Sequence, residues 1–343
     1  MHFASDNSGP VPQQILDALA KANQGYAMGY GADAEMEAVT AKIREIFEAP
    51  EAAVYLVATG TAANVLALST LAQPWQTIFC AGPSHIHMDE CNAPEFFSGA
   101  KLTLVSGADK ITSDALRAAI EGEETRGVHG PQRGPVSLAQ VTEYGTVYSL
   151  SELNALGALA KSYGLPLHMD GARFANALVS LGGTPAEMTW KAGIDAVSFG
   201  GTKNGCLGVE AVILFDPKRA EEFEYRRKRG AHLFSKHRYL SAQMLAYLSE
   251  DLWLHNARAA NAKTALLAEG LRAAGAEFTH APEANMIFAA LPRAKHQHLF
   301  DQGAVYHLWD GPLEGDPTEL VTARFVCDWS LPNAQLKAFL ALL

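Results

Sequence analysis

The sequence contains 343 residues and carries a formal net charge of −10; 48% of its residues are hydrophobic and 19% are charged. This composition is typical of a globular enzyme, and a chain of this length is long enough to form two domains. The negative charge argues against a nucleic-acid partner, and no apolar run approaches the length that spans a membrane. Because the four cysteines are scattered and the N-terminus lacks signal-peptide features, we expect reduced thiols and a cytoplasmic location.

Helical and extended patterns alternate along the first two thirds of the chain. Apolar spacing predicts helices from Pro12 to Asn23 and from about residue 35 to 47. A buried strand then begins at Ala53, and further strands are expected over 77–80, 99–105, 136–143, 194–199 and 209–215, with one more ending at Asp170. Helices are expected after residue 60 and over 113–121 and 150–163. This alternation predicts an α/β fold with a mostly parallel sheet between helices, and the short link between 199 and 209 predicts one antiparallel pair.

The last third of the chain has a different character. Residues 218–274 are helical in pattern, and 239–275 read as a connecting helix pair that leaves the sheet. Short strands over 286–291 and 321–326 and a helix after Pro332 predict a small α+β domain. We therefore expect a large domain with an N-terminal arm over 1–240, and connecting helices with a small C-terminal domain over 241–343.

An anion site is expected at the turn Thr59-Gly60-Thr61, which joins a strand to a helix. Free N–H groups and the helix dipole favour a negative ligand there. No GxxxxGK[ST] or GxGxxG pattern is present, so the turn indicates neither a nucleotide P-loop nor a dinucleotide fold. A simple helix cap is the structural alternative.

The densest polar cluster is Pro83-Ser-His-Ile-His-Met-Asp-Glu-Cys91. His85 and His87 are two residues apart, so both imidazoles lie on the same face of the backbone if this segment is a strand. One interpretation is a zinc hydrolase that uses His85, His87 and Asp89, although Glu90 stands where that motif needs another histidine. The other interpretation places His85 over a flat cofactor, where it handles protons.

Two further residues stand at strand ends, Asp170 before Gly-Ala-Arg and Lys203 between Gly201 and Gly205. Carboxyl ends of strands are where open α/β sheets bind ligands. An aspartate followed by a lysine in this arrangement matches enzymes of pyridoxal 5′-phosphate (PLP), in which the lysine forms a Schiff base and the aspartate keeps the pyridine nitrogen protonated. A helix cap is the structural alternative for Asp170.

Taken in order, these motifs resemble the low-specificity L-threonine aldolases, which are fold-type-I PLP enzymes. The resemblance rests on Thr59 to Asn64, Asp170 to Arg173 and Thr202-Lys203, and it extends to Ser5-Asp6, Tyr30-Gly31-x-Asp33 and Arg324 to Ser330. It covers nearly the whole chain. It implies retro-aldol cleavage of L-threonine, L-allo-threonine and related β-hydroxy-α-amino acids to glycine and an aldehyde.

The resemblance also implies roles for individual residues. Lys203 is the expected Schiff-base lysine, Asp170 the partner of the pyridine nitrogen and His85 the residue on the ring, while Gly60 and Thr61 are expected to hold the phosphate. Arg324 is expected to bind the substrate carboxylate with Ser5 and Arg173. Lys228 is expected to approach the cofactor phosphate of a neighbouring subunit, and Tyr30 is also expected to be supplied across the interface. A shared site implies an obligate dimer and favours a homotetramer built as a dimer of dimers, with the choice between dimer and tetramer left open.

The sequence departs from the family pattern at Thr142-Glu143-Tyr144-Gly145, where that pattern has Asn-Thr-His-Asn-Gly. This leaves the general base open. His85 is the first choice because imidazole titrates near neutrality, with His87, Glu90 and Tyr144 in reserve. Other fold-type-I lyases and aminotransferases remain alternatives for the reaction, and the zinc hydrolase remains an alternative from another class.

Overall fold

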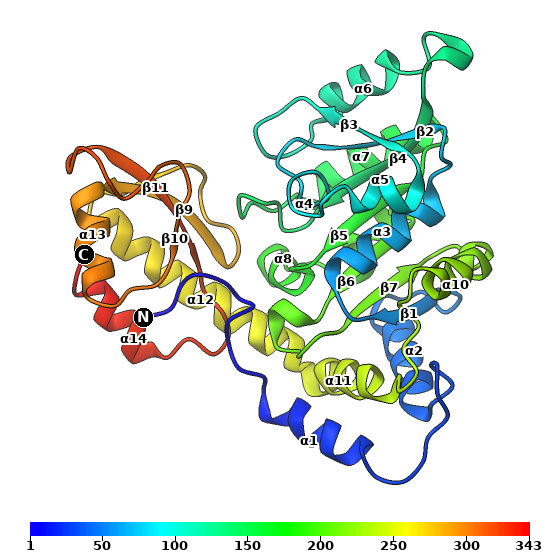
Figure 1. Ribbon diagram of the computed structural model, residues 1–343, viewed down its shortest axis with the longest axis horizontal. Coiled ribbons are helices and arrows are strands. Elements are labelled where there is room, and N and C mark those ends of the chain that lie inside the picture. The colour runs from blue at the N-terminus through cyan, green and yellow to red at the C-terminus, as the bar shows by residue number, and fades with distance from the viewer.

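The computed structural model describes residues 1–343 as two sheets, each with its own hydrophobic core. A 22-residue helix, α12 (Leu252–Ala273), runs from one to the other (Figure 1). No helix combines the length and apolar character that crossing a bilayer requires. The four cysteines are free, as their spacing predicts.

The larger sheet has seven strands in the order β1-β7-β6-β5-β4-β2-β3. Their bounds are β1 Ala53–Val57, β2 Gln76–Ala81, β3 Lys101–Val105, β4 Gln132–Ala139, β5 Leu167–Gly171, β6 Ala196–Gly200 and β7 Glu210–Leu214. Only β7 is antiparallel to its neighbours β1 and β6. The mostly parallel sheet and the antiparallel pair near residue 200 are therefore confirmed.

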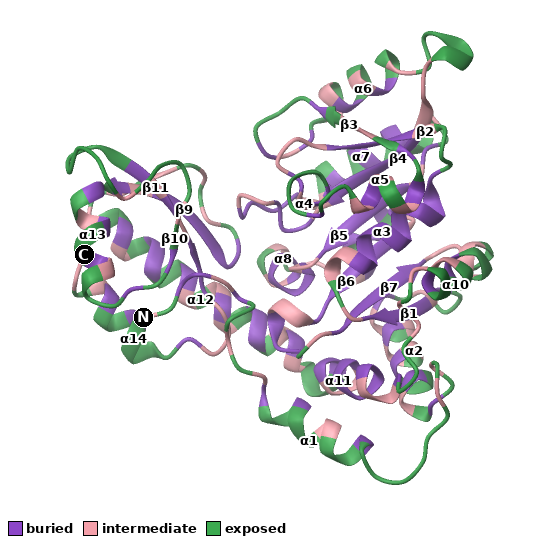
Figure 2. Ribbon diagram, viewed as in Figure 1, coloured by how far each residue is buried: buried purple, intermediate pink, exposed green.

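Helices cover both faces of this sheet, and its strands are largely buried except the edge strand β3 (Figure 2). Along β7, Ala211 and Ile213 join the main core, whereas Val212 and Leu214 join a second core against α3. Such alternation is what a strand buried on both faces requires. The helices of this part are α1 Gln13–Ala22, α2 Ala34–Ile46, α3 Gly60–Leu71, α4 His85–Met88, α5 Ala93–Ser98, α6 Ser113–Gly122, α7 Leu150–Ser162, α8 Phe174–Leu181, α9 Pro185–Met188, α10 Ala220–Arg229 and α11 Arg238–Leu248.

The smaller sheet is antiparallel, with the order β10-β11-β9-β8. It consists of β8 Glu277–Phe278, β9 Met286–Pro292, β10 His307–Leu308 and β11 Leu320–Val326, together with α13 Arg293–Asp301 and α14 Asn333–Leu340. The N-terminal arm joins this part, because Phe3 is fully buried in its core and Val326 N–H donates to the Phe3 carbonyl at 2.8 Å. The exact division of the chain near residue 240 stays a prediction.

One strand prediction is wrong in its position. The strand expected over 136–143 runs over Gln132–Ala139 instead. It contains Gly134 and Pro135, which sequence patterns place in loops, at a point where the register with β2 shifts between Thr77 and Phe79. Such an irregularity accommodates a proline that has no N–H to donate. As a consequence, Glu143 lies in the loop after the strand.

A glycine in α7 allows this helix to lie directly on the segment 190–193. A Cβ atom on Gly157 would lie 1.8 Å from the Ala192 carbonyl oxygen, which is a backbone atom and cannot rotate away. We expect Gly157→Ala to lower the free energy of unfolding by about 1–3 kcal/mol through overpacking.

Gly122→Ala is the matched control, because a Cβ atom there would meet no heavy atom within 4 Å. We expect this change in α6 to be neutral or to stabilise the protein by up to about 1 kcal/mol. Denaturant unfolding of both variants measures the difference, and equal stabilities would show that the contact at Gly157 is not the constraint.

Candidate active site

A cavity of about 350 Å³ lies at the edge of the larger sheet where the parallel strands end. The loops after β1, β4, β5 and β6 contribute to it, as does the start of β7, which reaches the same edge because that strand runs in the opposite direction. Its charged and polar lining comprises Asn7, Thr59, Thr61, Asn64, His85, Glu143, Asp170, Arg173, Thr202, Lys203 and Glu210. The sheet therefore brings together residues that are far apart in sequence.

The expected anion turn has two free donors. Thr59 caps α3, since its side chain accepts from Ala62 N–H at 3.1 Å, and Ala63 N–H donates to the Thr59 carbonyl. The first two N–H groups of the helix, those of Gly60 and Thr61, are left without helical partners and line the cavity. A Cβ atom on Gly60 would meet nothing within 4 Å, so there is room for an anion at this helix start.

Asp170 is held at the end of β5 by two bonds. Its Oδ1 accepts from Ala172 N–H at 3.0 Å, and its Oδ2 accepts from Asn64 Nδ2 at 2.9 Å. Asp170 is not the helix cap that was the structural alternative, because α8 begins at Phe174 and its N-cap position is Arg173. The bond from Asn64 fixes the carboxylate in the cavity wall.

His85 is the end of a buried hydrogen-bonded chain that starts at Asp170. Asn64 Nδ2 also donates to Glu90 Oε1 at 2.8 Å, and the same oxygen lies 2.8 Å from His85 Nδ1. The bond to Glu90 raises the pKa of His85, which favours the imidazolium form. Burial raises the pKa of Glu90, and the bond to His85 partly offsets this.

The prediction that His85 and His87 share the face of a strand is wrong. Both lie in the short helix α4, where residues two apart point in different directions, and His87 is exposed. No group of three or more His, Cys, Asp or Glu side chains is arranged to hold a metal ion. The zinc interpretation therefore loses the geometry on which it depended.

Lys203 lies on a one-turn 3-10 helix, Thr202–Asn204, directly after β6. Glu210, which sequence analysis missed, faces the same loop: its Oε2 accepts from Gly201 N–H at 2.6 Å. Burial raises the pKa of Glu210 to about 7, opposed by its hydrogen bonds and by the nearby charge of Lys203. A search for polar residues at the ends of strands does not identify Glu210, because this residue stands at the start of β7, which runs antiparallel to β6.

Arg173 is anchored by the N-terminal arm. Its Nε and Nη2 donate to the two oxygens of Asp6 at 2.7 and 3.0 Å, and the two side chains are only 11% and 1% exposed. Burial disfavours the charge of Asp6, but Arg173, Lys203 and the bond from Asn285 outweigh it and lower the pKa of the Asp6 carboxyl. In the sequence, Asp6 stands out only as part of the pair Ser5-Asp6.

The remaining expected site residues do not line the cavity. Ser5 is in the arm, two residues from the lining residue Asn7, whose N–H donates to Ser5 Oγ at 3.1 Å. Arg324, on β11, donates to the Ala4 carbonyl at 3.3 Å and its guanidinium lies 5.5 Å from the centre of the Trp309 ring.

Residues expected to serve a second subunit lie together elsewhere. The Lys228 ammonium, on α10, is 5.5 Å from the centre of the Tyr30 ring, and Tyr30 is 54% exposed. Tyr144, a reserve for the general base, packs on Phe288 and Trp309 rather than in the cavity lining.

The cavity fits PLP in its donor set. Two unpaired helix N–H groups suit a phosphate, a carboxylate at a strand end suits a protonated ring nitrogen, and a lysine amine in the same cavity suits an aldehyde. Fold and site together define a fold-type-I PLP enzyme.

Comparisons with known proteins narrow this class. The family model of the β-eliminating lyases matches residues 2–293. A low-specificity L-threonine aldolase from a Pseudomonas species is 40% identical over 343 residues, covering 99% of this chain and 96% of that protein. The chain belongs to the β-eliminating lyase family, within its group of low-specificity L-threonine aldolases.

Solved structures agree with this family. A threonine aldolase from Leishmania major superposes with a TM-score of 0.92 at 25% identity, covering 99% of this chain and 98% of that one. A serine palmitoyltransferase from S. paucimobilis, solved with bound PLP and myriocin, has a TM-score of 0.69 at 16% identity and covers 100% of this chain and 86% of its own. The second likeness concerns the fold alone.

The buried carboxyl of Glu210 makes stability depend on pH. Its folded-state pKa of about 7 exceeds the ordinary 4.5, so the folded protein binds this proton more tightly than the unfolded chain does. Its contribution is therefore most favourable below pH 4.5 and declines by about 3 kcal/mol as the pH rises to 7.

Glu210→Gln keeps an acceptor for Gly201 N–H but cannot ionise. We expect this variant, freed of cofactor, to gain stability relative to the parent between pH 5 and pH 8, measured by urea unfolding at both values. A stability difference that does not change with pH would contradict the burial of an ionisable carboxyl at this position.

Proposed function

We propose that this protein cleaves L-threonine, L-allo-threonine and related β-hydroxy-α-amino acids to glycine and an aldehyde. The observation that carries this proposal is the meeting of Lys203, Asp170, His85 and the Gly60-Thr61 N–H pair in one cavity. The membership of the chain among the threonine aldolases supports the reaction. Bound PLP supplies an electron sink for the Cα–Cβ bond electrons as that bond breaks.

Different residues of the cavity bind different parts of the cofactor. Lys203 would attach the cofactor through Nζ, and the Gly60 and Thr61 N–H groups would hold its phosphate. Asp170 would keep a proton on the ring nitrogen, and its bonds to Asn64 and Ala172 fix its carboxylate. His85 would contact the cofactor, and the orientation of its imidazole is set by Glu90.

We assign the substrate carboxylate to Arg324, Ser5 and Arg173, of which Arg173 lines the cavity. Arg324 Nε is buried without a hydrogen-bond partner, so a carboxylate there satisfies an unpaired donor. Arg173 uses Nε and Nη2 for Asp6, which leaves Nη1 for the substrate.

The active enzyme is proposed to be a homotetramer built as a dimer of dimers. Tyr30 and Lys228 lie outside the cavity of their own chain and next to each other, on a part of the surface where Tyr26 and Met28 are also exposed. An exposed apolar and basic cluster of this kind suits contact with a neighbouring subunit whose site needs a positive charge.

Lys203→Ala tests the reaction. Because the variant cannot attach the cofactor, we expect formation of glycine and acetaldehyde from L-threonine to fall by a factor of about 10³ or more. The exposed Lys337→Ala is the control and should keep the parent rate. Normal cleavage by the Lys203 variant would refute the assignment, and release of ammonia and a keto acid by the parent enzyme would indicate a different lyase or an aminotransferase.

A further inference from the structure

Glu143 is a cavity residue without an assigned task. It lies in the loop after β4 and lines the cavity together with His85, Asp170, Arg173 and Lys203. Its carboxylate makes no hydrogen bond or ion pair within the chain, whereas Asp170 is fixed by two hydrogen bonds. A half-buried acceptor that is left free in a binding site is available to a ligand.

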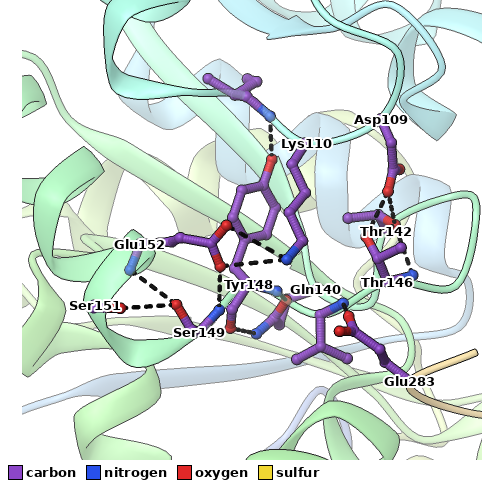
Figure 3. A network of polar contacts seen from close by, with 12 residues as sticks. Asp109, Lys110, Gln140, Thr142, Thr146, Tyr148, Ser149, Ser151, Glu152 and Glu283 are labelled. Atoms are coloured by element: carbon purple, nitrogen blue, oxygen red, sulfur yellow. Dashed lines mark hydrogen bonds and ion pairs between the residues drawn. The ribbon is translucent and has the colours of Figure 1, made fainter. Parts of the chain in front are cut away.

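The loop that carries Glu143 is held by a polar network (Figure 3). Gln140 bonds through its side chain to both backbone groups of Tyr148, at 2.9 Å each. Thr142 Oγ1 donates to Asp109 Oδ2 at 3.1 Å and accepts from Thr146 N–H at 3.1 Å, and Thr146 Oγ1 also donates to Asp109 Oδ2. The turn is thus closed on both sides of Glu143.

The next residue anchors the loop from the other direction. The Tyr144 ring packs edge-on against Phe288, with ring centres 5.1 Å apart, and against Trp309 at 6.4 Å. These contacts attach the loop to the smaller sheet and its neighbouring loop. With Thr142 and Tyr144 both fixed, the position of Glu143 in the cavity wall is defined by the fold and not by chance.

The charges around Glu143 come from every neighbouring element. Burial raises the pKa of its carboxyl, and the charge of Asp170 raises it further. The charges of Arg173, Lys203 and His85 lower this pKa. Arg324 on β11 is also close enough to interact with it. A carboxylate whose pKa is raised is a stronger base than an exposed one.

His85 is less suited to accept a further proton. Its Nδ1 is already bonded to Glu90, and that bond favours the imidazolium form. The bond also commits the ring to the chain that leads to Asp170 through Asn64. His85 is therefore assigned to the cofactor, whereas Glu143 is a carboxylate of the same cavity lining that has no hydrogen-bond partner.

We propose that Glu143 accepts the proton of the substrate β-hydroxyl, an inference that rests on the proposed aldolase function. The O–H electron pair becomes the second bond of the aldehyde C=O, the Cα–Cβ bond breaks and its electrons remain on the glycine side. Cα then takes up a proton, and the proton on Glu143 is released. Threonine thereby becomes glycine and acetaldehyde without any oxidant or reductant.

The experiment uses the holoenzyme and Glu143→Gln, which keeps the shape of the side chain and removes its basicity. Three properties are compared with those of the parent: cleavage of L-threonine, exchange of the glycine α-proton in D₂O followed by NMR, and the glycine dissociation constant from the visible spectrum of the bound cofactor. Glycine has no β-hydroxyl, so we expect its exchange and its affinity to stay within about 3-fold while cleavage falls about 10²- to 10⁴-fold.

Glu314→Gln, at an exposed position far along the chain, is the matched control and should leave all three values unchanged. Parent-like cleavage by Glu143→Gln, or an equal loss of cleavage and glycine exchange, would overturn the inference. If the Gln variant does not fold, Glu143→Asp takes its place: cleavage should fall at least about 10-fold with exchange preserved, and equal effects on both would overturn it. A parent enzyme that neither cleaves threonine nor exchanges glycine would instead refute the aldolase function itself.

Discussion

The ion pair between Arg173 and Asp6 joins the three parts of the molecule that meet at the cavity. Arg173 follows β5 of the larger sheet, Asp6 belongs to the N-terminal arm, and Asn285, just before β9, donates to Asp6 Oδ2 at 3.0 Å. Loss of one partner from such a buried pair costs about 3–5 kcal/mol, because the other charge is left uncompensated. Binding geometry and the docking of the arm are therefore set by the same contact.

The edge of the sheet gathers several carboxylates beside one lysine, and each of these carboxylates except Glu143 accepts a hydrogen bond. Asp170 bonds to an amide, Glu90 to an imidazole and Glu210 to backbone N–H groups. Lys203 lines the same cavity. Glu143 is the exception, because its carboxylate has no hydrogen-bond partner within the chain and is available to a ligand.

Much of the fold follows from local patterns, because alternating apolar strands and amphipathic helices are local properties. The same holds for Asp170, near the end of β5, and Lys203, just after β6, which had to lie at one edge of a parallel sheet. Glu210 could not be found in this way because it precedes an antiparallel strand. The helix at His85 and the pairing of Asp6 with a residue 167 positions away depend on tertiary contacts, which no local pattern records.

Reduction of the holoenzyme with borohydride, followed by mass analysis of its peptides, tests the central claim most directly. We expect the visible absorption of the cofactor to disappear and the reduced cofactor to be found on the peptide that contains Lys203. A label on another lysine, or a protein that binds no PLP and gains no adduct, would contradict it.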